Sequence, residues 1–270
     1  MKKYIIILVL IFNFSCKAKK EVLLPKKIYR TIDNSKEVLL PKKIYRTIDN
    51  SKEMIEEFFY DGRKLSKINF YHNNEIVHHA YFKYDDNLIT SIDYIDNNIL
   101  DEIKFIYDKN DILIREVYKY NQKDSLVTDF KTISINEIQS KANRIAYNSV
   151  SYKTMFFSGN NINYSTSNDG NVRTTYEYDT QFSPFINVIG FHKQVSISGI
   201  EFWERSENNI LKERIEHFKS IIAIAEYSYK YNEKGYPTII EYFVKQGCEE
   251  CEGNRPYIYE IEYVIFANTM

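Results

Sequence analysis

The sequence predicts an all-β protein: an antiparallel β-meander of many hairpins, curved or closed into a barrel-like sheet, with at most one or two short helices. Turn residues recur roughly every twelve residues across Met54–Asn121, the spacing of short strands joined by tight hairpins. Apolar and polar side chains alternate between these turns, as in a half-buried sheet. The chain holds 24 Tyr and 17 Phe but only 8 Gly and 5 Pro, so we expect Asn and Asp to supply most turns.

Most of the predicted corners begin with a tyrosine that a turn residue follows. The pairs are Tyr60-Asp61, Tyr84-Asp85, Tyr107-Asp108 and Tyr120-Asn121, and further turn signals lie at Tyr71–Asn74 and Tyr94–Asn98. Strict alternation predicts that Ile76, His78, Ala80, Phe82 and Tyr84 share one face of a strand. It likewise predicts that Ile112, Ile114, Tyr118 and Tyr120 lie opposite Leu113, Arg115, Val117 and Lys119.

Two segments also carry a helical pattern. Ser134 and Glu137 have the spacing of a capping box, so Ser134–Tyr147 can be read as a short helix or as strand. Ile210–Ala225 has an apolar helical stripe. The Asn208-Asn209 turn before it and the tyrosines after it favour two strands instead, with a turn near Lys219-Ser220.

The N-terminus has the pattern of an export signal. Two lysines precede the mostly apolar run Tyr4–Phe14, which is too short to span a bilayer as a stop-transfer helix. Ser15-Cys16 resembles the end of a bacterial lipobox, although Asn13 departs from its aliphatic pattern. We therefore predict a lipoprotein signal over residues 1–15, lipidation of Cys16, and a lipid-anchored location in the cell envelope, on the outer membrane. The alternative is an ordinary cleaved signal with an incidental cysteine.

An identical repeat follows the signal. Glu21–Lys36 and Glu37–Lys52 have the same sixteen residues, which indicates an in-frame duplication. Extra residues are tolerated better in a tether than in a core, so residues 16–52 are predicted to be a tether and residues 53–270 a single β-meander domain. Lys42–Asp49 could pair with Met54–Tyr60, but only one copy can fill that place, and we expect the first copy to be linker.

Charge divides the chain at the same point. Residues 17–52 carry 11 Lys and Arg against 4 Asp and Glu, a net charge of +7, and residues 53–270 carry 23 against 33, a net charge of −10. A basic tether suits anionic lipid headgroups, although a solvated linker would have the same composition. The acidic body argues against nucleic acid as a partner, because nucleic-acid binders present basic surfaces to phosphates.

Cys248 and Cys251 form the most pointed local motif. A zinc site needs about four ligands, and no second cysteine pair accompanies these two. Three nearby glutamates would raise the pKa of the thiols, which argues against redox chemistry. The remaining readings are a loop disulfide, suited to an oxidising envelope, or a free pair.

No catalytic, metal or cofactor motif stands out elsewhere. His78 and His79 are adjacent in a predicted strand, so their rings point to opposite faces and cannot easily share an ion. Phe202 and Trp203 are candidates for stacking on a glycan or peptide ligand, but aromatic residues also suit sheet packing. Spacing pairs no two carboxylates across a substrate, and phosphate-binding and dinucleotide-binding fingerprints are missing from the sequence.

Several blocks in the second half of the chain carry a family resemblance. They are Tyr176–Asp179, Ser183–Phe185, Ser206–Asn209 and Tyr227–Ile240. In this order they resemble a family of Bacteroidota lipoproteins with tyrosine–aspartate repeats, with Ser183 departing from the family's usual asparagine. The resemblance covers roughly Met54 to Phe266 and implies a porin-like β fold, but the family has no assigned function and supplies no catalytic residue.

Three classes of function remain open. The first is a non-enzymatic, lipid-anchored binding or structural module, and the second is a carbohydrate- or peptide-active envelope enzyme with an unrecognised site. The third is an outer-membrane barrel. Against the third, Glu116 shares a strand face with Ile112 and Ile114, and Lys67 shares one with Leu65, where a lipid-facing band should be apolar.

Overall fold

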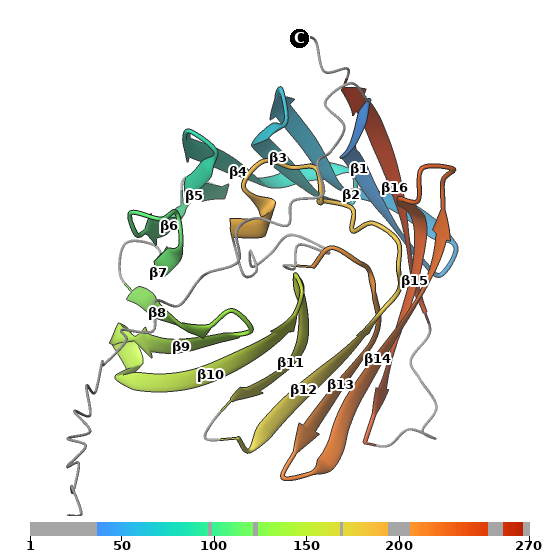
Figure 1. Ribbon diagram of the computed structural model, residues 1–270. Coiled ribbons are helices and arrows are strands. Elements are labelled where there is room, and N and C mark those ends of the chain that lie inside the picture. Colours follow the sequence, from blue (N-terminus) through green and yellow to red (C-terminus); the bar gives the residue numbers. More distant parts are fainter. Residues whose placement is uncertain are drawn as a thin grey trace, which may run out of the picture.

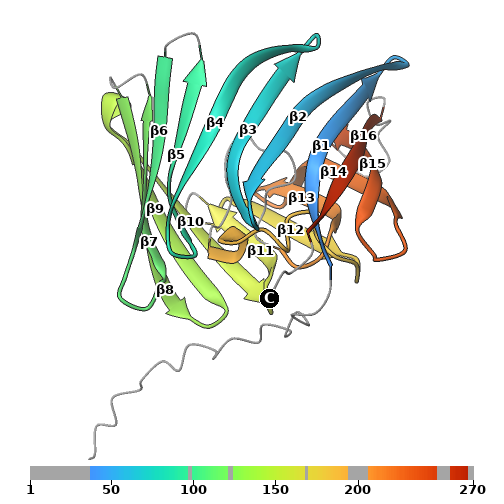
Figure 2. The same ribbon diagram turned by 90° about the horizontal axis from the view of Figure 1, so that it is seen from above.

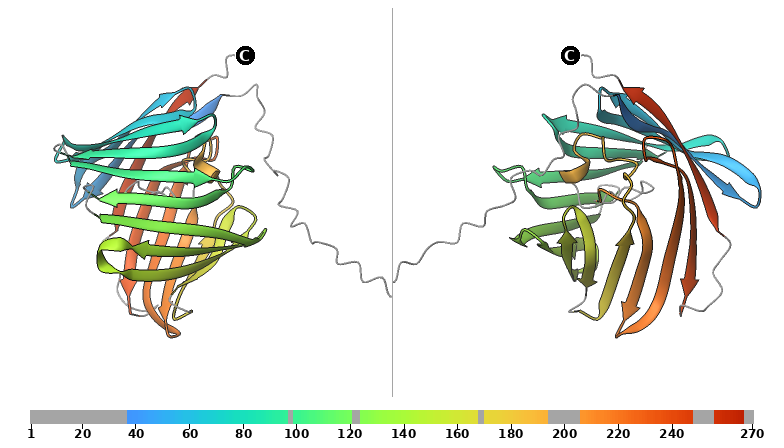
Figure 3. Two further views of the ribbon diagram at one scale, coloured as in Figure 1. Left: turned by 90° about the vertical axis from the view of Figure 1, so that its left-hand side faces the viewer. Right: turned by 45° about the vertical axis from the view of Figure 1, so that its right-hand side comes forward.

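The computed structural model describes residues 37–96, 99–120, 124–167, 170–193, 206–247 and 256–266. These residues form sixteen antiparallel strands in one closed barrel, in which every strand pairs with its neighbours in sequence and β1 pairs with β16 (Figure 1). Figure 2 shows the resulting order of neighbours across one side of the barrel, and Figure 3 shows it from two further directions. The prediction of an antiparallel meander, either curved or closed into a barrel, is confirmed, and the sheet is closed.

The elements have the following bounds. The first eight strands are β1 (Val38–Ile48), β2 (Ser51–Asp61), β3 (Lys64–His72), β4 (Glu75–Asp85), β5 (Leu88–Asp96), β6 (Ile99–Tyr107), β7 (Leu113–Tyr120) and β8 (Asp124–Ser134). The others are β9 (Glu137–Arg144), β10 (Ser149–Ser158), β11 (Asn161–Ser167), β12 (Val172–Tyr178), β13 (Ile210–His217), β14 (Ser220–Tyr231), β15 (Pro237–Gln246) and β16 (Tyr257–Phe266). Two single 3₁₀ turns, η1 (Ile145–Tyr147) and η2 (Phe191–Lys193), are the helical elements of the described residues.

Tight turns close the end of the barrel that we call the hairpin end, where β1 meets β2, β3 meets β4 and β13 meets β14. Both central residues of these turns have positive φ: 47° and 65° at Asp49-Asn50, and 52° and 62° at Asn73-Asn74. This is the geometry of type I′ turns, whose twist matches that of the strands and which Asn and Asp tolerate well. The third such turn is Phe218-Lys219, so the prediction of a hairpin over Ile210–Ala225 is confirmed.

A segment between β12 and β13 fills the opposite end, which we call the plug end. Residues 179–193, including η2, fold back inside the ring of strands (Figure 1). Backbone N–H groups of this plug donate to the carbonyls of Arg63 and Gly235, and the ammonium of Lys193 donates to the carbonyl of Asp111. These carbonyls belong to the turns after β2, β14 and β6, so the plug is fastened to one end of the barrel.

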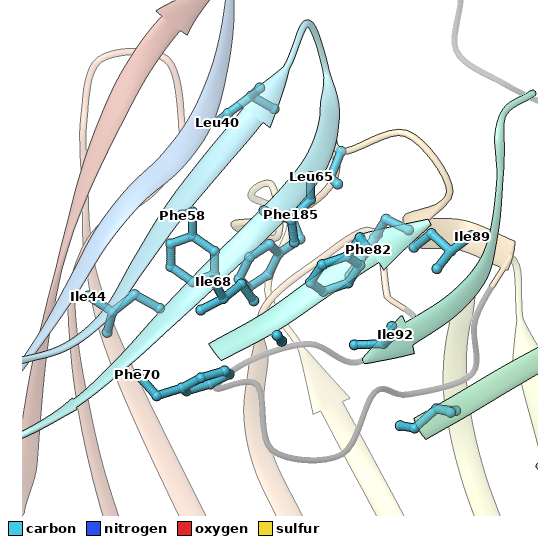
Figure 4. Packing of buried hydrophobic residues seen from close by; sticks show 14 of the residues in the cluster. Leu40, Ile44, Phe58, Leu65, Ile68, Phe70, Phe82, Ile89, Ile92 and Phe185 are labelled. Carbon is cyan, nitrogen blue, oxygen red and sulfur yellow. The ribbon is translucent and has the colours of Figure 1, made fainter. Parts of the chain in front are cut away.

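The plug completes the main hydrophobic core. Phe185 and Phe191 are fully buried, and the ring of Phe185 lies 5.5 Å from the ring of Phe58, centroid to centroid. Figure 4 shows Phe185 among side chains from β2 and β3. The fully buried aliphatic members of the cluster include Leu40, Ile44, Leu65, Ile68, Ile89 and Ile92. The barrel interior is therefore apolar at this end, and burial of this surface is a main source of stability.

The tyrosine repeat has a structural reason. Several of these tyrosines sit at a register shift near the plug end, where the ring turns inward and the hydroxyl reaches the preceding strand. The hydroxyl of Tyr60 donates to the carbonyl of Pro41 at 2.7 Å, that of Tyr107 to Ile89 at 2.7 Å, and that of Tyr178 to Ile162 at 2.9 Å. Each such tyrosine therefore gives its hydroxyl a backbone acceptor on the preceding strand.

Two readings of local pattern are corrected. The helical reading of Ser134–Tyr147 is wrong: Ser134 ends β8, and its hydroxyl accepts a hydrogen bond from the N–H of Asn136 in the turn to β9. Strict alternation is also wrong beside the bulges. Leu113 is buried and Ile114 is 40% exposed, because a register shift between Ile106 and Tyr107 reverses the faces there. Ile76 is exposed for the same reason.

The barrel begins inside the repeated segment. β1 lies within the second copy, residues 37–52, which the sequence analysis grouped with the tether. Its Leu40 and Ile44 have no exposed surface, and the strand pairs on both sides, with β2 and β16. The pairing considered for Lys42–Asp49 and Met54–Tyr60 is therefore present, and the β domain starts at Val38 rather than at residue 53. The first copy lies outside the described residues.

Candidate binding site in the barrel lumen

Polar and aromatic side chains line the lumen away from the plug. The pairing register shows which face of the sheet each of these side chains is on. Tyr118 is the direct partner of buried Ile103, and Glu116 is the direct partner of buried Phe105. Tyr94 is likewise the partner of Asp101. Since partners in a sheet point to the same face, these side chains face the lumen. We define Tyr94, Asp101, Glu116, Tyr118 and Tyr120 as the acidic tyrosine cluster.

Ring contacts and hydrogen bonds organise this cluster. The rings of Tyr118 and Tyr120 lie 4.1 Å apart with an interplanar angle of 38°, and the Tyr118 hydroxyl lies 3.3 Å from an Asp101 carboxylate oxygen. Arg144 of β9 lies 5.2 Å from the Tyr120 ring centroid and forms an ion pair with Asp124 at 3.0 Å. Tyr120 therefore already accepts one cation–π contact from the protein.

Burial perturbs the acids of the lumen. It raises the pKa of Glu116 to about 7, and within the described chain this carboxylate has no hydrogen-bond or ion-pair partner. Burial also raises the pKa of Glu213 on β13, opposed by Lys153. A carboxylate desolvated without compensation destabilises the fold, so such groups are more common at functional sites than elsewhere.

A second row of tyrosines crosses the lumen face of β14, β15 and β16. Tyr227 and Tyr242 are cross-strand partners with ring centroids 4.9 Å apart, and Tyr242 and Tyr257 are partners at 6.0 Å. All three rings retain some exposed surface. Tyrosine rings offer flat apolar faces with a hydrogen-bonding tip, which suits stacking on a ligand.

The wall formed by β9–β14 bears small side chains. By register, those that face the lumen include Ser140, Ala142, Ser151, Ser165, Thr174 and Ala223. They occupy little volume, and the hydroxyls among them can donate and accept hydrogen bonds. The lumen thus sets two tyrosine rows with carboxylates against a wall that bears small side chains together with Lys153 and Glu213.

The outer face of the barrel has the opposite character. Lysine, arginine and carboxylate side chains project outward from most strands and form ion pairs at 2.6 to 3.8 Å, all of them between strands except Lys104–Glu102 within β6. The pairs are Lys43–Glu57, Lys52–Glu260, Lys83–Asp93, Lys104–Glu102, Lys119–Glu102, Arg115–Asp129, Lys212–Glu226 and Lys245–Glu226. A depression of about 280 Å³ on this face is lined by Leu100, Glu102, Lys119 and Ser125, whose charges are paired with each other.

The predicted site residues fall outside this region. Cys16, Phe202, Trp203, Cys248 and Cys251 all lie outside the described residues, so lipidation, ligand stacking and the disulfide stay predictions.

The two adjacent histidines are described, and they face opposite sides of β4. His78 stacks on Phe70 in the lumen with ring centroids 4.2 Å apart, whereas His79 Nδ1 lies 2.8 Å from Asn69 Oδ1 on the outside. Among the described residues, no group of three or more His, Cys, Asp or Glu could hold a metal ion. The same residues contain no helix with the length and apolar character needed to cross a membrane.

Comparison with known proteins gives similarity of fold only. No family model matches the chain, and no curated protein matches it. Among solved structures it is similar to a porin-like protein from Bacteroides uniformis ATCC 8492, with 11% identity, a TM-score of 0.42 and coverage of 84% of this chain and 96% of that one. It is also similar to a porin-like protein from Bacteroides vulgatus ATCC 8482, with 11% identity, a TM-score of 0.43 and coverage of 84% and 99%. Likeness at this level does not indicate a function.

The acidic tyrosine cluster was not among the predicted sites. Alternation did place Glu116, Tyr118 and Tyr120 on one strand face, which is the signal that the sequence contained. The sequence did not indicate that this face lines a lumen, or that Tyr94 and Asp101 of β5 and β6 lie beside it.

Proposed function

We propose that this protein is a lipid-anchored envelope barrel that lies outside the bilayer and binds a glycan in its lumen without chemical conversion. The observation that carries the proposal is the division of side chains between the two faces of the barrel wall. Most ion-paired charges point outward, with Arg144–Asp124 an inward exception, and tyrosines with carboxylates and small hydroxyl residues point inward.

The outward charges argue against a barrel that spans the membrane. A spanning barrel needs an outward apolar band about 25 Å tall, and each Lys or Arg at the bilayer midplane costs roughly 2–4 kcal/mol. Lys104, Glu102 and Glu226 lie well inside their strands, and similar pairs recur around the wall. The outer face is instead suited to water.

The path of the chain gives the end of the barrel at which the anchor would attach. β1 starts at the plug end, so the segment that leads back to Cys16 joins the barrel there. Fully extended, residues 17–36 reach at most about 70 Å at roughly 3.5 Å per residue. A lipid on Cys16 would therefore hold the plug end of the barrel within about 70 Å of its membrane.

The inward side chains favour a glycan as the ligand. Tyrosine rings stack on the apolar faces of sugar rings, and carboxylates and hydroxyls take the hydrogen bonds of sugar hydroxyl groups. Both tyrosine rows lie on the lumen side, so an extended oligosaccharide could contact both.

Glycan binding by the soluble body, produced without the signal, tests this proposal. We expect Tyr118→Ala and Tyr257→Ala each to weaken binding about fivefold, because a stacked aromatic contributes on the order of 1 kcal/mol. Tyr152→Ala is the matched control, since Tyr152 is 51% exposed and points outward from β10. Failure of a broad glycan panel to bind, or binding of peptides instead, would refute the choice of ligand.

Cell fractionation tests the anchored location. In whole cells, Cys16→Ala should release the protein into the soluble fraction if the lipid is the anchor. Retention of this variant in membranes after mild detergent washing would favour a spanning barrel.

A carbohydrate-active enzyme is the second candidate, and one observation favours it. A carboxyl group whose pKa is near 7, as that of Glu116 is, suits a general acid. Hydrolysis of a bound oligosaccharide that Glu116→Gln abolishes, while binding is kept, would favour the enzyme over the binding module.

A further inference from the structure

The strand that closes the barrel exists twice in the sequence. β1 joins the two ends of the meander, pairing with β16 on one side and β2 on the other. It lies entirely within Glu37–Lys52, and Glu21–Lys36 repeats that segment at all sixteen positions. Val22–Ile32 therefore has the sequence of β1, residue for residue.

Apart from those with Ser51 and Lys52 at the start of β2, the contacts of β1 are made with groups that the repeat does not contain. The buried Leu40 and Ile44 pack against other strands, and the counterparts of these two residues in the first copy are Leu24 and Ile28. The carbonyl of Leu39 accepts a hydrogen bond from the Asn187 side chain of the plug, and that of Pro41 accepts one from the Tyr60 hydroxyl.

Charged contacts of β1 follow the same rule. Arg46 forms an ion pair with Glu53 at 2.7 Å, and Glu37 forms one with Lys234 at 3.0 Å. Glu53 and Lys234 both lie outside the repeat. The first copy carries the same arginine and glutamate at Arg30 and Glu21, so it could make each of these contacts in turn.

We propose that Glu21–Lys36 is a spare first strand, which closes the barrel between β16 and β2 whenever the second copy is unable to do so. Both copies run in the same direction, so the exchange leaves β2–β16 and the plug in place. The second copy then becomes part of the connection to β2 at the hairpin end. This inference does not depend on the proposed function.

Loop length sets the preference between the two copies. β1 is joined to β2 by the two-residue turn Asp49-Asn50, and the exchange would replace it with a connection of 18 residues, 33–50. The closure probability of a flexible loop falls as roughly the three-halves power of its length, which favours the second copy by about 30-fold. A substitution in β1 that would otherwise unfold the barrel should therefore raise the unfolding equilibrium constant of the barrel only about 30-fold, because the first copy takes the place of β1.

Four full-length chains test the proposal: wild type, Ile28→Asp, Ile44→Asp and the double variant. Ile44 has no exposed surface and is the direct partner of buried Glu56, so an aspartate there is strongly unfavourable. We expect Ile28→Asp to leave the unfolding equilibrium constant unchanged and Ile44→Asp to raise it about 30-fold. The double variant should raise the same constant at least a thousandfold or fail to fold. The proposal is overturned if Ile44→Asp alone behaves like the double variant, or if the double variant is no worse than Ile44→Asp.

A disulfide crosslink identifies the strand that occupies the site. Lys43 and Glu262 are cross-strand partners, so Lys43→Cys with Glu262→Cys should crosslink in a chain whose natural cysteines are replaced by serine. The matched pair is Lys27→Cys with Glu262→Cys, which should crosslink within one chain once Ile44→Asp is present and only weakly without it. Absence of this crosslink, or its formation only between two chains, would overturn the exchange.

Discussion

The buried carboxylate of Glu116, which has no hydrogen-bond or ion-pair partner among the described residues, allows a quantitative prediction about stability. Burial raises its pKa from 4.5 to about 7, so folding favours its protonated form. Each pKa unit corresponds to about 1.4 kcal/mol, which gives on the order of 3 kcal/mol as the largest loss of stability on ionisation. Because the folded pKa is raised, stability is fully present below pH 4.5 and is lost as the pH rises towards and through 7.

Glu116→Gln should remove this loss, because an amide of the same shape has no charge to desolvate. Urea unfolding followed by circular dichroism at pH values from 4.5 to 8.5 measures the effect. We expect the free energy of unfolding of wild type to fall relative to the variant across this range, with most of the difference developed by pH 8. Glu213 ionises in both chains and therefore cancels in the comparison.

Glu75→Gln is the matched control, because Glu75 is exposed at the start of β4. It should leave the pH profile of wild type unchanged. Parallel profiles for wild type and Glu116→Gln would refute the assignment of Glu116 as a desolvated lumen carboxylate, and so would a variant that becomes relatively less stable as the pH rises.

Three further predictions concern the plug, a turn and the repeat. Phe185→Ala should cost about 3–5 kcal/mol of stability by chemical denaturation, because the fully buried ring leaves a cavity, whereas exposed Ile135→Ala should cost little; equal effects would contradict a packed plug. Phe218→Asn combined with Lys219→Gly should raise stability by about 1–2 kcal/mol, since both residues have positive φ; a lower melting temperature would count against strain in this turn. Deletion of residues 21–36 should leave the melting temperature nearly unchanged, because the second copy already supplies β1, and a large drop would contradict this.

Local sequence determined most of the strands as a series of hairpins, although it left β1 in the tether. Tyrosine–aspartate corners and alternating side chains predicted hairpins, and short connections make consecutive strands neighbours. It also resolved Ile210–Ala225 correctly, since the flanking turns outweighed the helical stripe. It misread Ser134–Tyr147 because the serine that resembles a helix cap instead stabilises a turn. In a helix cap and in a turn alike, the serine hydroxyl accepts a hydrogen bond from a nearby backbone N–H group, so the two have the same local sequence signal.

Only the tertiary structure decided which face of each strand is inside. A strand has two faces, and alternation separates them without indicating which one lines a lumen. Bulges then reverse the faces partway along, as at Leu113 and Ile114. The surroundings of Glu116 come from several strands, so no single segment contains the signal that raises its pKa. Closure itself joins Ile44 to Ile261, residues from opposite ends of the chain, and pairing over that distance depends on every intervening hairpin.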